Sequence, residues 1–304
     1  MAEPADTYEE AQRAAYLAPE SVEEALAMLA EHGEGAKPIA GGQSLLILLR
    51  WGLAAPTYLV GLKRIPELTH LAATPEGGLT IGAMVTQHAL ETSPLVRTSF
   101  PALADAAGAV ASPPVRRQAT IGGNLCHADP AADPPAALIA LGAEVEIAHR
   151  GGRRRLPVAE LFRGFLDTAI GPDELLVAIH IPPAGPRTGT AYLKHRVRGV
   201  DYALVGVGFG LTLAEDGQTC AEARIGLAGV GDTPLRAMAA EAVLHGQPVT
   251  EATLRASGEA AAAECHPPSD TEGSEWYRRE MVKVFVGRAG VVALQRARDV
   301  NVPS

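Results

Sequence analysis

The chain has 304 residues, of which 47% are hydrophobic and 20% are charged, and its formal net charge is −9. This length predicts two or three domains with sizeable cores. The negative charge argues against nucleic acid as a partner, because no basic field gathers phosphates over an extended surface. Aromatic residues make up only 4% of the chain, so we expect cores built mainly of alanine, leucine and valine.

The cysteines and the apolar runs indicate a cellular compartment. Cys126, Cys220 and Cys265 are scattered and form no C-x-x-C spacing, which is typical of a reducing compartment and predicts neither a disulfide framework nor a metal site. Cys126 and His127 are adjacent, and adjacent residues rarely reach one metal ion. The acidic start, Met1 to Asp6, lacks the apolar core of a signal peptide, and no apolar run reaches the ~18–20 residues that span a bilayer. The sequence therefore predicts a soluble cytoplasmic protein with no membrane span.

A small α/β unit is predicted for residues 1–62. Ser21 and Glu24 have the spacing of a capping box and predict a helix over residues 22–31. Residues 37–40 and 57–62 are predicted to be the strands on either side of a glycine-containing loop and a short apolar helix.

A larger α+β unit is predicted for residues 63–181, with a hairpin, a group of helices and a second hairpin. Its predicted hairpins occupy residues 71–82 and 144–156, and its predicted helices occupy residues 86–91, 101–109 and 133–141. The run Arg153-Arg154-Arg155 follows Gly151-Gly152 and is interpreted as the solvated flank of the second hairpin.

A proline-rich stretch, residues 182–186, marks the boundary of a third domain, residues 186–300. Its predicted strands are residues 190–196, 203–213 and 222–229, and its predicted helices are residues 235–244, 251–264 and 274–297. The predicted fold class is α+β: a domain of two subdomains followed by a C-terminal domain of antiparallel sheet with helices.

Two glycine-rich motifs carry the chemistry. They are Ala40-Gly41-Gly42-Gln43-Ser44 and Thr120-Ile121-Gly122-Gly123-Asn124. Paired glycines let the main chain approach a ligand, and polar side chains beside exposed N–H groups suit phosphate. Together the motifs suggest two sides of a cradle for a long ligand with a pyrophosphate in its middle. The alternative for each motif is an ordinary turn, and no G-x-G-x-x-G fingerprint occurs.

These motifs, in this order, resemble the FAD-binding medium subunit of the molybdenum hydroxylases, the family of xanthine dehydrogenase and carbon monoxide dehydrogenase. The resemblance extends from Ala18 to nearly the end of the chain, through residues 105–107, 115–116, 127–133, 172–176 and 274–279. It implies the two-subdomain FAD-binding domain and the C-terminal domain predicted above.

The resemblance also implies site residues. Ala40, Gly41, Gly42, Gln43 and Ser44 would bind the FAD pyrophosphate and adjoining ribityl together with Thr120, Ile121, Gly122, Gly123 and Asn124. Asp133 aligns with a FAD contact, Leu176 with an apolar residue packed on the cofactor, and Lys194 with a lysine near the flavin. The alternative for Asp133 is a helix N-cap, which does not exclude a flavin contact, and for Lys194 an exposed strand lysine. Residues 196–202 match a loop near the flavin ring.

By the same resemblance, the chain would pass electrons from [2Fe–2S] clusters of a small partner subunit, through non-covalent FAD, to an external acceptor. Substrate would be oxidised at a molybdenum cofactor in a large subunit, and the assembly would be a dimer of heterotrimers. This chain would hold no catalytic residue of that hydroxylation and no metal. One alternative is a stand-alone FAD-dependent alcohol oxidase, with His127 as a covalent anchor. Another is a non-catalytic scaffold.

Overall fold

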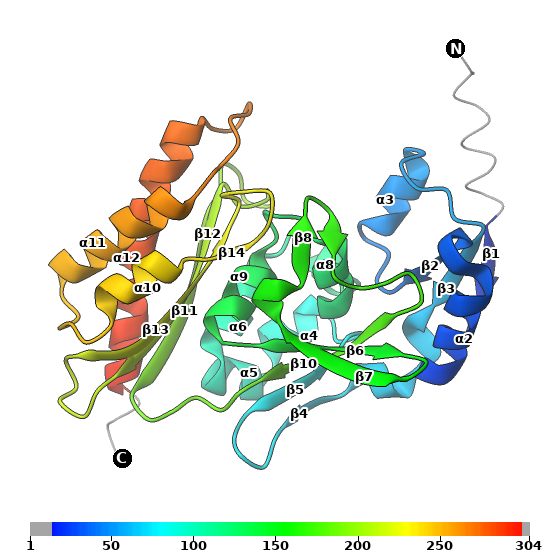
Figure 1. Cartoon of the computed structure of the whole chain (residues 1–304), viewed down its shortest axis with the longest axis horizontal. Helices are drawn as coiled ribbons and strands as arrows, with labels where there is room; N and C mark the ends of the chain where they lie inside the picture. Colours follow the sequence, from blue (N-terminus) through cyan, green and yellow to red (C-terminus); the bar gives the residue numbers. More distant parts are fainter. Residues whose placement is uncertain (1–13, 300–304) are drawn as a thin grey trace.

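A computed structural model describes residues 14–299, so the expectations for the acidic start of the chain lie outside the described residues. Three units follow one another along the molecule, each with its own sheet (Figure 1). The predicted fold class is confirmed: a small α/β unit and a larger α+β unit precede a unit of antiparallel sheet with helices.

The first unit is a parallel sheet in the order β1-β3-β2, covered by helix α2. Its elements are β1 (Ala15–Leu17), α2 (Val22–His32), η1 (Gly33–Gly35), β2 (Ala36–Ile39), α3 (Leu45–Arg50), β3 (Tyr58–Gly61), η2 (Leu62–Arg64) and η3 (Pro66–Thr69). The strand β1 was not predicted, because its three residues carry no alternation to detect.

Helix α2 begins where the sequence predicts. Ser21 Oγ accepts a hydrogen bond from the Glu24 amide at 3.1 Å, as an N-cap does. The Glu24 carboxylate reaches back to the amide of Glu20 at 2.8 Å, one residue before the position of a standard capping box. Gly33, with φ +54°, ends the helix.

The second unit contains an antiparallel sheet in the order β4-β5-β10-β6-β7. Its strands are β4 (Leu71–Ala73), β5 (Leu79–Gly82), β6 (Glu144–His149), β7 (Gly152–Pro157) and β10 (Leu175–Ile181), with η4 (Val158–Glu160) and a small hairpin of β8 (Phe162–Gly164) and β9 (Asp167–Thr168). Both predicted hairpins are confirmed. The central strand β10 was not predicted, because a continuously buried strand shows no alternation of polar and apolar residues.

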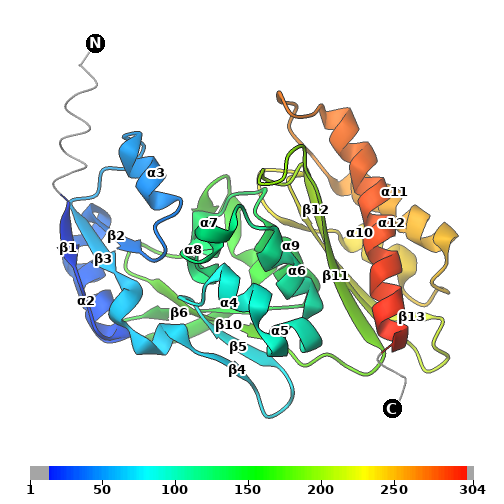
Figure 2. The ribbon, with the colours of Figure 1, turned by 180° about the vertical axis from the view of Figure 1, so that it is seen from behind.

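Six helices belong to the second unit: α4 (Gln87–Thr92), α5 (Pro94–Ser99), α6 (Pro101–Ala109), α7 (Pro113–Arg116), α8 (Ile121–His127) and α9 (Asp133–Ala140). Figure 2 shows α6 and α9 between the central sheet and the third sheet, and both helices pack on strands of the latter. The core beneath them is rich in leucine, isoleucine, valine and alanine.

The third unit is an antiparallel sheet in the order β11-β12-β13-β14, with α10, α11 and α12 on the face away from α9 (Figure 1). Its elements are β11 (Thr188–His195), β12 (Val205–Leu213), β13 (Cys220–Ala228), β14 (Leu235–Arg236), α10 (Met238–Leu244), α11 (Glu251–Glu264) and α12 (Glu275–Asp299). The helix predicted from residue 235 begins only at Met238, because Leu235 and Arg236 pair with β13.

Glycines bring the third sheet close to the second unit. A Cβ on Gly208 would lie 2.2 Å from the Ala136 carbonyl oxygen of α9, and one on Gly226 would lie 2.1 Å from the same oxygen. Side chains at these positions would force the sheet off the helix. The second and third units therefore meet through a close backbone contact.

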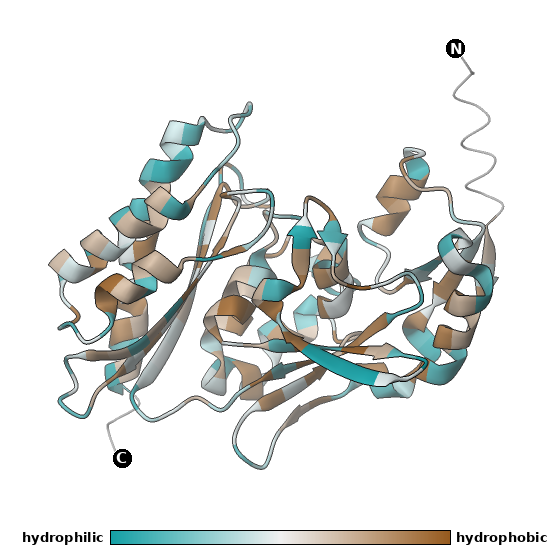
Figure 3. Ribbon diagram, viewed as in Figure 1, coloured by the Kyte–Doolittle hydropathy of each residue, from teal (hydrophilic) through white to brown (hydrophobic). Residues whose placement is uncertain are grey.

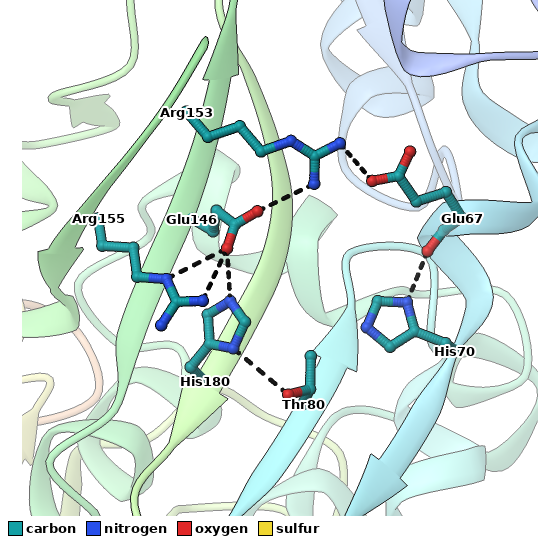
Figure 4. Close-up of polar contacts among 7 residues, drawn as sticks. All are labelled: Glu67, His70, Thr80, Glu146, Arg153, Arg155 and His180. Carbon is teal, nitrogen blue, oxygen red and sulfur yellow. Dashed lines mark hydrogen bonds and ion pairs between the residues drawn. The ribbon is translucent and has the colours of Figure 1, made fainter. Parts of the chain in front are cut away.

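The arginine run on β7 is held in ion pairs (Figure 4). Arg153 and Arg155 donate to Glu146 at 3.0 and 3.1 Å, and His180 Nε2 lies 2.8 Å from the same carboxylate. Arg153 also pairs with Glu67 of η3. In Figure 3 β7 is the hydrophilic strand at the edge of the sheet. The interpretation of this run as a hairpin flank is confirmed. Among residues 14–299, no helix is long and apolar enough to span a membrane.

Candidate cofactor site

The first glycine loop joins β2 to α3 and presents a row of backbone amides. Gly42 has φ +71°, a conformation that favours glycine. The N–H groups of residues 41–44 donate to no acceptor within residues 14–299. The side chain of Gln43 stays near the loop, where its Nε2 donates to the Gly41 carbonyl at 3.3 Å. Successive amides in such a turn form a concave anion site.

The second glycine motif is the first turn of helix α8, where a loop had been expected. Thr120 is the N-cap, and its Oγ1 accepts from the Gly123 amide at 3.1 Å. The amides of Ile121 and Gly122 donate to the carbonyls of Val85 and Ala83, each at 2.9 Å. These two N–H groups are therefore engaged within the protein, and the contact expected between this motif and a ligand stays a prediction. The Thr120 hydroxyl has no acceptor within the described residues and remains able to donate.

Two of the glycines allow one part of the chain to approach another. A Cβ on Gly41 would lie 2.0 Å from the Gln118 carbonyl oxygen, and one on Gly122 would lie 2.6 Å from the Ala83 Cβ. The Gly41 contact brings the first loop against the residues just before Thr120. The two motifs, far apart in sequence, thus lie side by side, and part of the reason for their glycines is packing within the protein.

The side-chain oxygens of two amide residues beside these motifs are buried without a donor. Asn124 Oδ1 and Gln87 Oε1 are both buried, and neither accepts a hydrogen bond from the part of the chain that the structure describes. Gln87 is fully buried, and its Nε2 donates weakly to the Thr120 carbonyl at 3.5 Å. An unsatisfied buried acceptor costs about 1–3 kcal/mol. Asn124 therefore suits a ligand that supplies a donor, such as a hydroxyl group.

Asp133 and Lys194 form a buried ion pair between the second and third units. Lys194 Nζ lies 2.9 Å from Asp133 Oδ2, and both side chains are 5% exposed. Tyr192 donates its hydroxyl to the other Asp133 oxygen at 2.5 Å, and Lys194 Nζ also donates to the Ala109 carbonyl at 3.1 Å. Lys194 is therefore not an exposed strand lysine. Nor is Asp133 a helix N-cap, since Ala132 holds that position and the Asp133 side chain makes no capping bond.

Burial shifts the pKa values of Asp133 and Tyr192. It raises the pKa of Asp133, while the ammonium of Lys194 and the hydroxyl of Tyr192 act in the opposite direction. Burial, with the Asp133 charge beside it, raises the pKa of Tyr192 well above its ordinary value. Tyr192 is therefore a neutral donor to the carboxylate.

The chain matches two families of known proteins, which together cover most of its length. Residues 9–184 match the family described as "FAD binding domain in molybdopterin dehydrogenase", and residues 190–291 match "CO dehydrogenase flavoprotein C-terminal domain". The chain belongs to this flavoprotein family. It is accordingly a FAD-binding subunit of the oxidoreductase class, as the sequence resemblance predicted.

Known proteins are similar to the flavoprotein in sequence and structure over nearly its whole length. It is 36% identical over 283 residues to the 6-hydroxypseudooxynicotine dehydrogenase complex subunit alpha of Paenarthrobacter nicotinovorans, covering 93% of this chain and 95% of the relative. It is 38% identical over 285 residues to the carbon monoxide dehydrogenase medium chain of Afipia carboxidovorans, covering 93% and 98%. The solved carbon monoxide dehydrogenase of Hydrogenophaga pseudoflava superposes with a TM-score of 0.90 at 38% identity, covering 93% and 98% of the two chains.

The geometry of the flavoprotein fits FAD. The amides of residues 41–44 suit a pyrophosphate, the Thr120 hydroxyl can donate to it, and Asn124 Oδ1 can accept from a polyol such as ribityl. Leu176, on β10, is 2% exposed and belongs to the core of the second unit, so it offers at most an edge to a ligand.

The loop after Lys194 in the flavoprotein lies near the segment before Asp133. The amide of Ala203 donates to the Ala131 carbonyl at 3.5 Å. Tyr202, in the loop, is 53% exposed. Residues of the third unit therefore border the same region as the end of α8 and the start of α9.

Sequence reasoning missed Tyr192 and Gln87 as parts of the site. Tyr192 lies two residues before Lys194 on one strand, so the two side chains lie on the same face of the sheet. This spacing could have indicated that both contact Asp133. Gln87 gives no such signal, because nothing in its neighbourhood in sequence predicts complete burial. Within residues 14–299, no group of three or more histidine, cysteine, aspartate or glutamate side chains is arranged to hold a metal ion.

Proposed function

We propose that the first loop, residues 40–44, is the principal anion site and holds the pyrophosphate of one non-covalently bound FAD. The unengaged amides of residues 41–44 support this most directly. Thr120 would donate to the same phosphates and Asn124 would bind the ribityl chain. Ile121, Gly122 and Gly123 would shape the wall through their backbone, and Leu176 through its edge.

We further propose that the Asp133–Lys194 pair borders the flavin ring. Tyr192 and the Ala109 carbonyl fix both partners, so the pair would present a rigid dipole to the ring and not a mobile cation. FAD, when bound, supplies a centre that exchanges electrons singly or in pairs. The residues of this chain bind it, orient it and limit the access of water.

The proposed role is an electron relay within a molybdenum hydroxylase complex in the cytoplasm. Electrons would arrive from [2Fe–2S] clusters of a small subunit, after substrate oxidation at molybdenum in a large subunit, and leave to an external acceptor. Two trimers of these subunits would form the assembly. The names of the relatives, medium chains or subunits of dehydrogenase complexes, support a relay over the stand-alone oxidase. The three free cysteines suit a reducing compartment.

The test begins with the full chain expressed alone and loaded with FAD. Acid precipitation is expected to release all flavin as FAD, with no iron or molybdenum in the washed protein. The bound flavin is expected to be reduced by dithionite and to ignore aldehydes, N-heterocycles and alcohols, whereas substrate should bleach it in the reconstituted complex. Substantial oxidation of an alcohol by the isolated chain, or flavin retained at His127 after denaturation, would overturn the relay in favour of the oxidase.

A further inference from the structure

The first turn of α12 holds both ends of the loop that follows Lys194. Tyr277 Oη lies 2.9 Å from His195 Nε2, at the start of the loop. Arg278 donates from Nη1 to the Leu204 carbonyl at 3.0 Å, at the end of the loop. Consecutive residues of one helix thus bind the two flanks of one loop.

The loop is closed at its neck by the backbone. The Leu204 amide donates to the His195 carbonyl at 2.9 Å, so residues 196–203 leave the sheet and return beside their starting point. Inside the loop, the Arg198 amide donates to Asp201 Oδ2 at 2.9 Å. Val200 and Tyr202 are more than half exposed, at 59% and 53%. The neck is therefore fixed while the tip faces outward.

Arg278 reaches a second segment of the site. Its side chain is 5% exposed, and Nη1 also lies 3.4 Å from the Gly229 carbonyl. The Gly229 amide donates in turn to the Pro130 carbonyl at 2.8 Å, three residues before Asp133. One guanidinium therefore links the end of the loop to the segment that leads into α9.

Burial of the Arg278 guanidinium costs free energy that packing of the helix end alone does not require. Arg278 Nε is buried without a hydrogen-bond partner among residues 14–299. Its Nη2 donates to Asp270 Oδ2 at 2.6 Å, and the Asp270 side chain is 44% exposed. Burying a guanidinium largely on carbonyl groups costs desolvation energy that an apolar side chain would not. What the guanidinium adds is a fixed separation between two segments of the cofactor site.

We infer that Tyr277 and Arg278 are positioning residues, which set the loop of residues 196–203 and the segment of residues 129–133 against the flavin. The inference rests on the proposed function, because it takes the flavin ring to lie between these segments. The loop tip then forms the outer border of the ring, where an acceptor must approach. Loosening either contact is expected to move the border without removing the FAD anchor at residues 40–44.

Trypsin cleavage of the full chain without FAD tests the positioning alone, since Arg196 and Arg198 lie in the loop. Tyr277→Phe keeps the ring and removes one hydrogen bond, which should speed cleavage there about five-fold. The control is Tyr16→Phe, because the Tyr16 hydroxyl makes no hydrogen bond within residues 14–299 and its side chain is exposed. Asp270→Asn, which weakens the hold on Arg278 from an exposed position, should act in the same direction.

The same variants loaded with FAD test the position of the loop beside the ring. Tyr277→Phe should change the visible circular dichroism of the bound flavin while the thermal midpoint and the FAD affinity stay near those of the parent. Unchanged cleavage in both Tyr277→Phe and Asp270→Asn would overturn the positioning. If cleavage is faster in the variants, but bound FAD neither slows it nor changes its spectrum, then Tyr277 and Arg278 do hold the loop. In that case the proposed position of the flavin ring beside the loop is refuted.

Discussion

Lys194 Nζ and Asp133 Oδ2 lie 2.9 Å apart, and their ion pair joins the third unit to the second at the edge of the candidate cofactor site. Both charges are almost fully buried, and Tyr192 donates to the carboxylate oxygen that Lys194 does not bind. Burying such a pair costs desolvation free energy. Removing one partner costs far more, because the other would remain as an uncompensated buried charge.

Lys194→Met is therefore expected to lower the free energy of unfolding by about 3–5 kcal/mol, the typical result of removing one partner of a buried pair. Urea unfolding at pH 7 measures it. The control is Lys194→Met combined with Asp133→Asn, which removes both charges and keeps an acceptor for Tyr192. The double variant should recover most of the loss, and a double variant less stable than Lys194→Met would contradict the pair as the cause.

Gly42→Ala tests whether the first loop is the anion site. Its φ of +71° costs an alanine about 1–2 kcal/mol, and relief of that strain would turn the amides of residues 41–44 away from their common direction. We expect the dissociation constant for FAD, measured by flavin fluorescence, to increase by an order of magnitude or more. Gly246→Ala is the control for the backbone strain, with the same φ of +71°. The space around it is open, whereas a Cβ on Gly42 would lie 3.1 Å from Leu46 Cδ1. The control should lose comparable stability with FAD affinity unchanged; equal loss of affinity in both variants would point to general strain.

Gly122→Ala tests the close approach of α8 to the second unit. The added Cβ would lie 2.6 Å from the Ala83 Cβ and 2.7 Å from its carbonyl oxygen, which accepts the Gly122 amide. Overpacking of this kind typically costs about 1–3 kcal/mol, so the thermal midpoint should fall even without FAD. Gly287→Ala, in α12 with nothing nearby, should be neutral or stabilising by about 0.5–1 kcal/mol. A Gly122→Ala protein that lost FAD at full stability would restore the simpler view that this glycine serves only ligand approach.

Local rules predicted much of the fold from the sequence. Ser21 caps α2 as its spacing indicates, and the glycine turn between β6 and β7 closes a hairpin as predicted. The late start of α10 and the paired first amides of α8 were not predicted, because contacts with distant parts of the chain decide both. The amides of Ile121 and Gly122 at the start of α8 donate to Val85 and Ala83, which lie far away in the sequence, and sequence spacing reveals neither acceptor.

The sequence predicted the kind of ligand for the candidate site but not the contacts among its residues. The two glycine motifs lie side by side as a shared cradle would require, but their sequences look alike while one leaves its amides unengaged and the other does not. The difference depends on which backbone carbonyls lie nearby, a fact of tertiary structure. Lys194 and Asp133 were placed near the flavin by resemblance, and only the structure shows that they bind each other.

The last prediction concerns pH and the residues ahead of the second motif. Arg116 donates two hydrogen bonds to Glu91, at 2.8 and 3.1 Å, and also holds the carbonyls of Val110 and Ala111, the latter with φ +38°. The guanidinium holds the pKa of the Glu91 carboxyl below its ordinary value of 4.5. The stability it contributes is therefore present above pH 4.5 and lost as the pH falls through the lowered pKa of the folded state.

Glu91→Gln should cost about 1–2 kcal/mol at pH 7, because it removes charge-assisted hydrogen bonds. In urea titrations from pH 4.5 downward, the gap in free energy of unfolding between parent and variant should close as the Glu91 carboxylate of the parent takes up its proton. Glu280→Gln is the control, since its pair with Lys283 is more than a third exposed on both sides and should contribute almost nothing. A Glu91→Gln gap that persisted unchanged into acid would mean that the side chain stabilises this turn by packing, and that its charge contributes nothing.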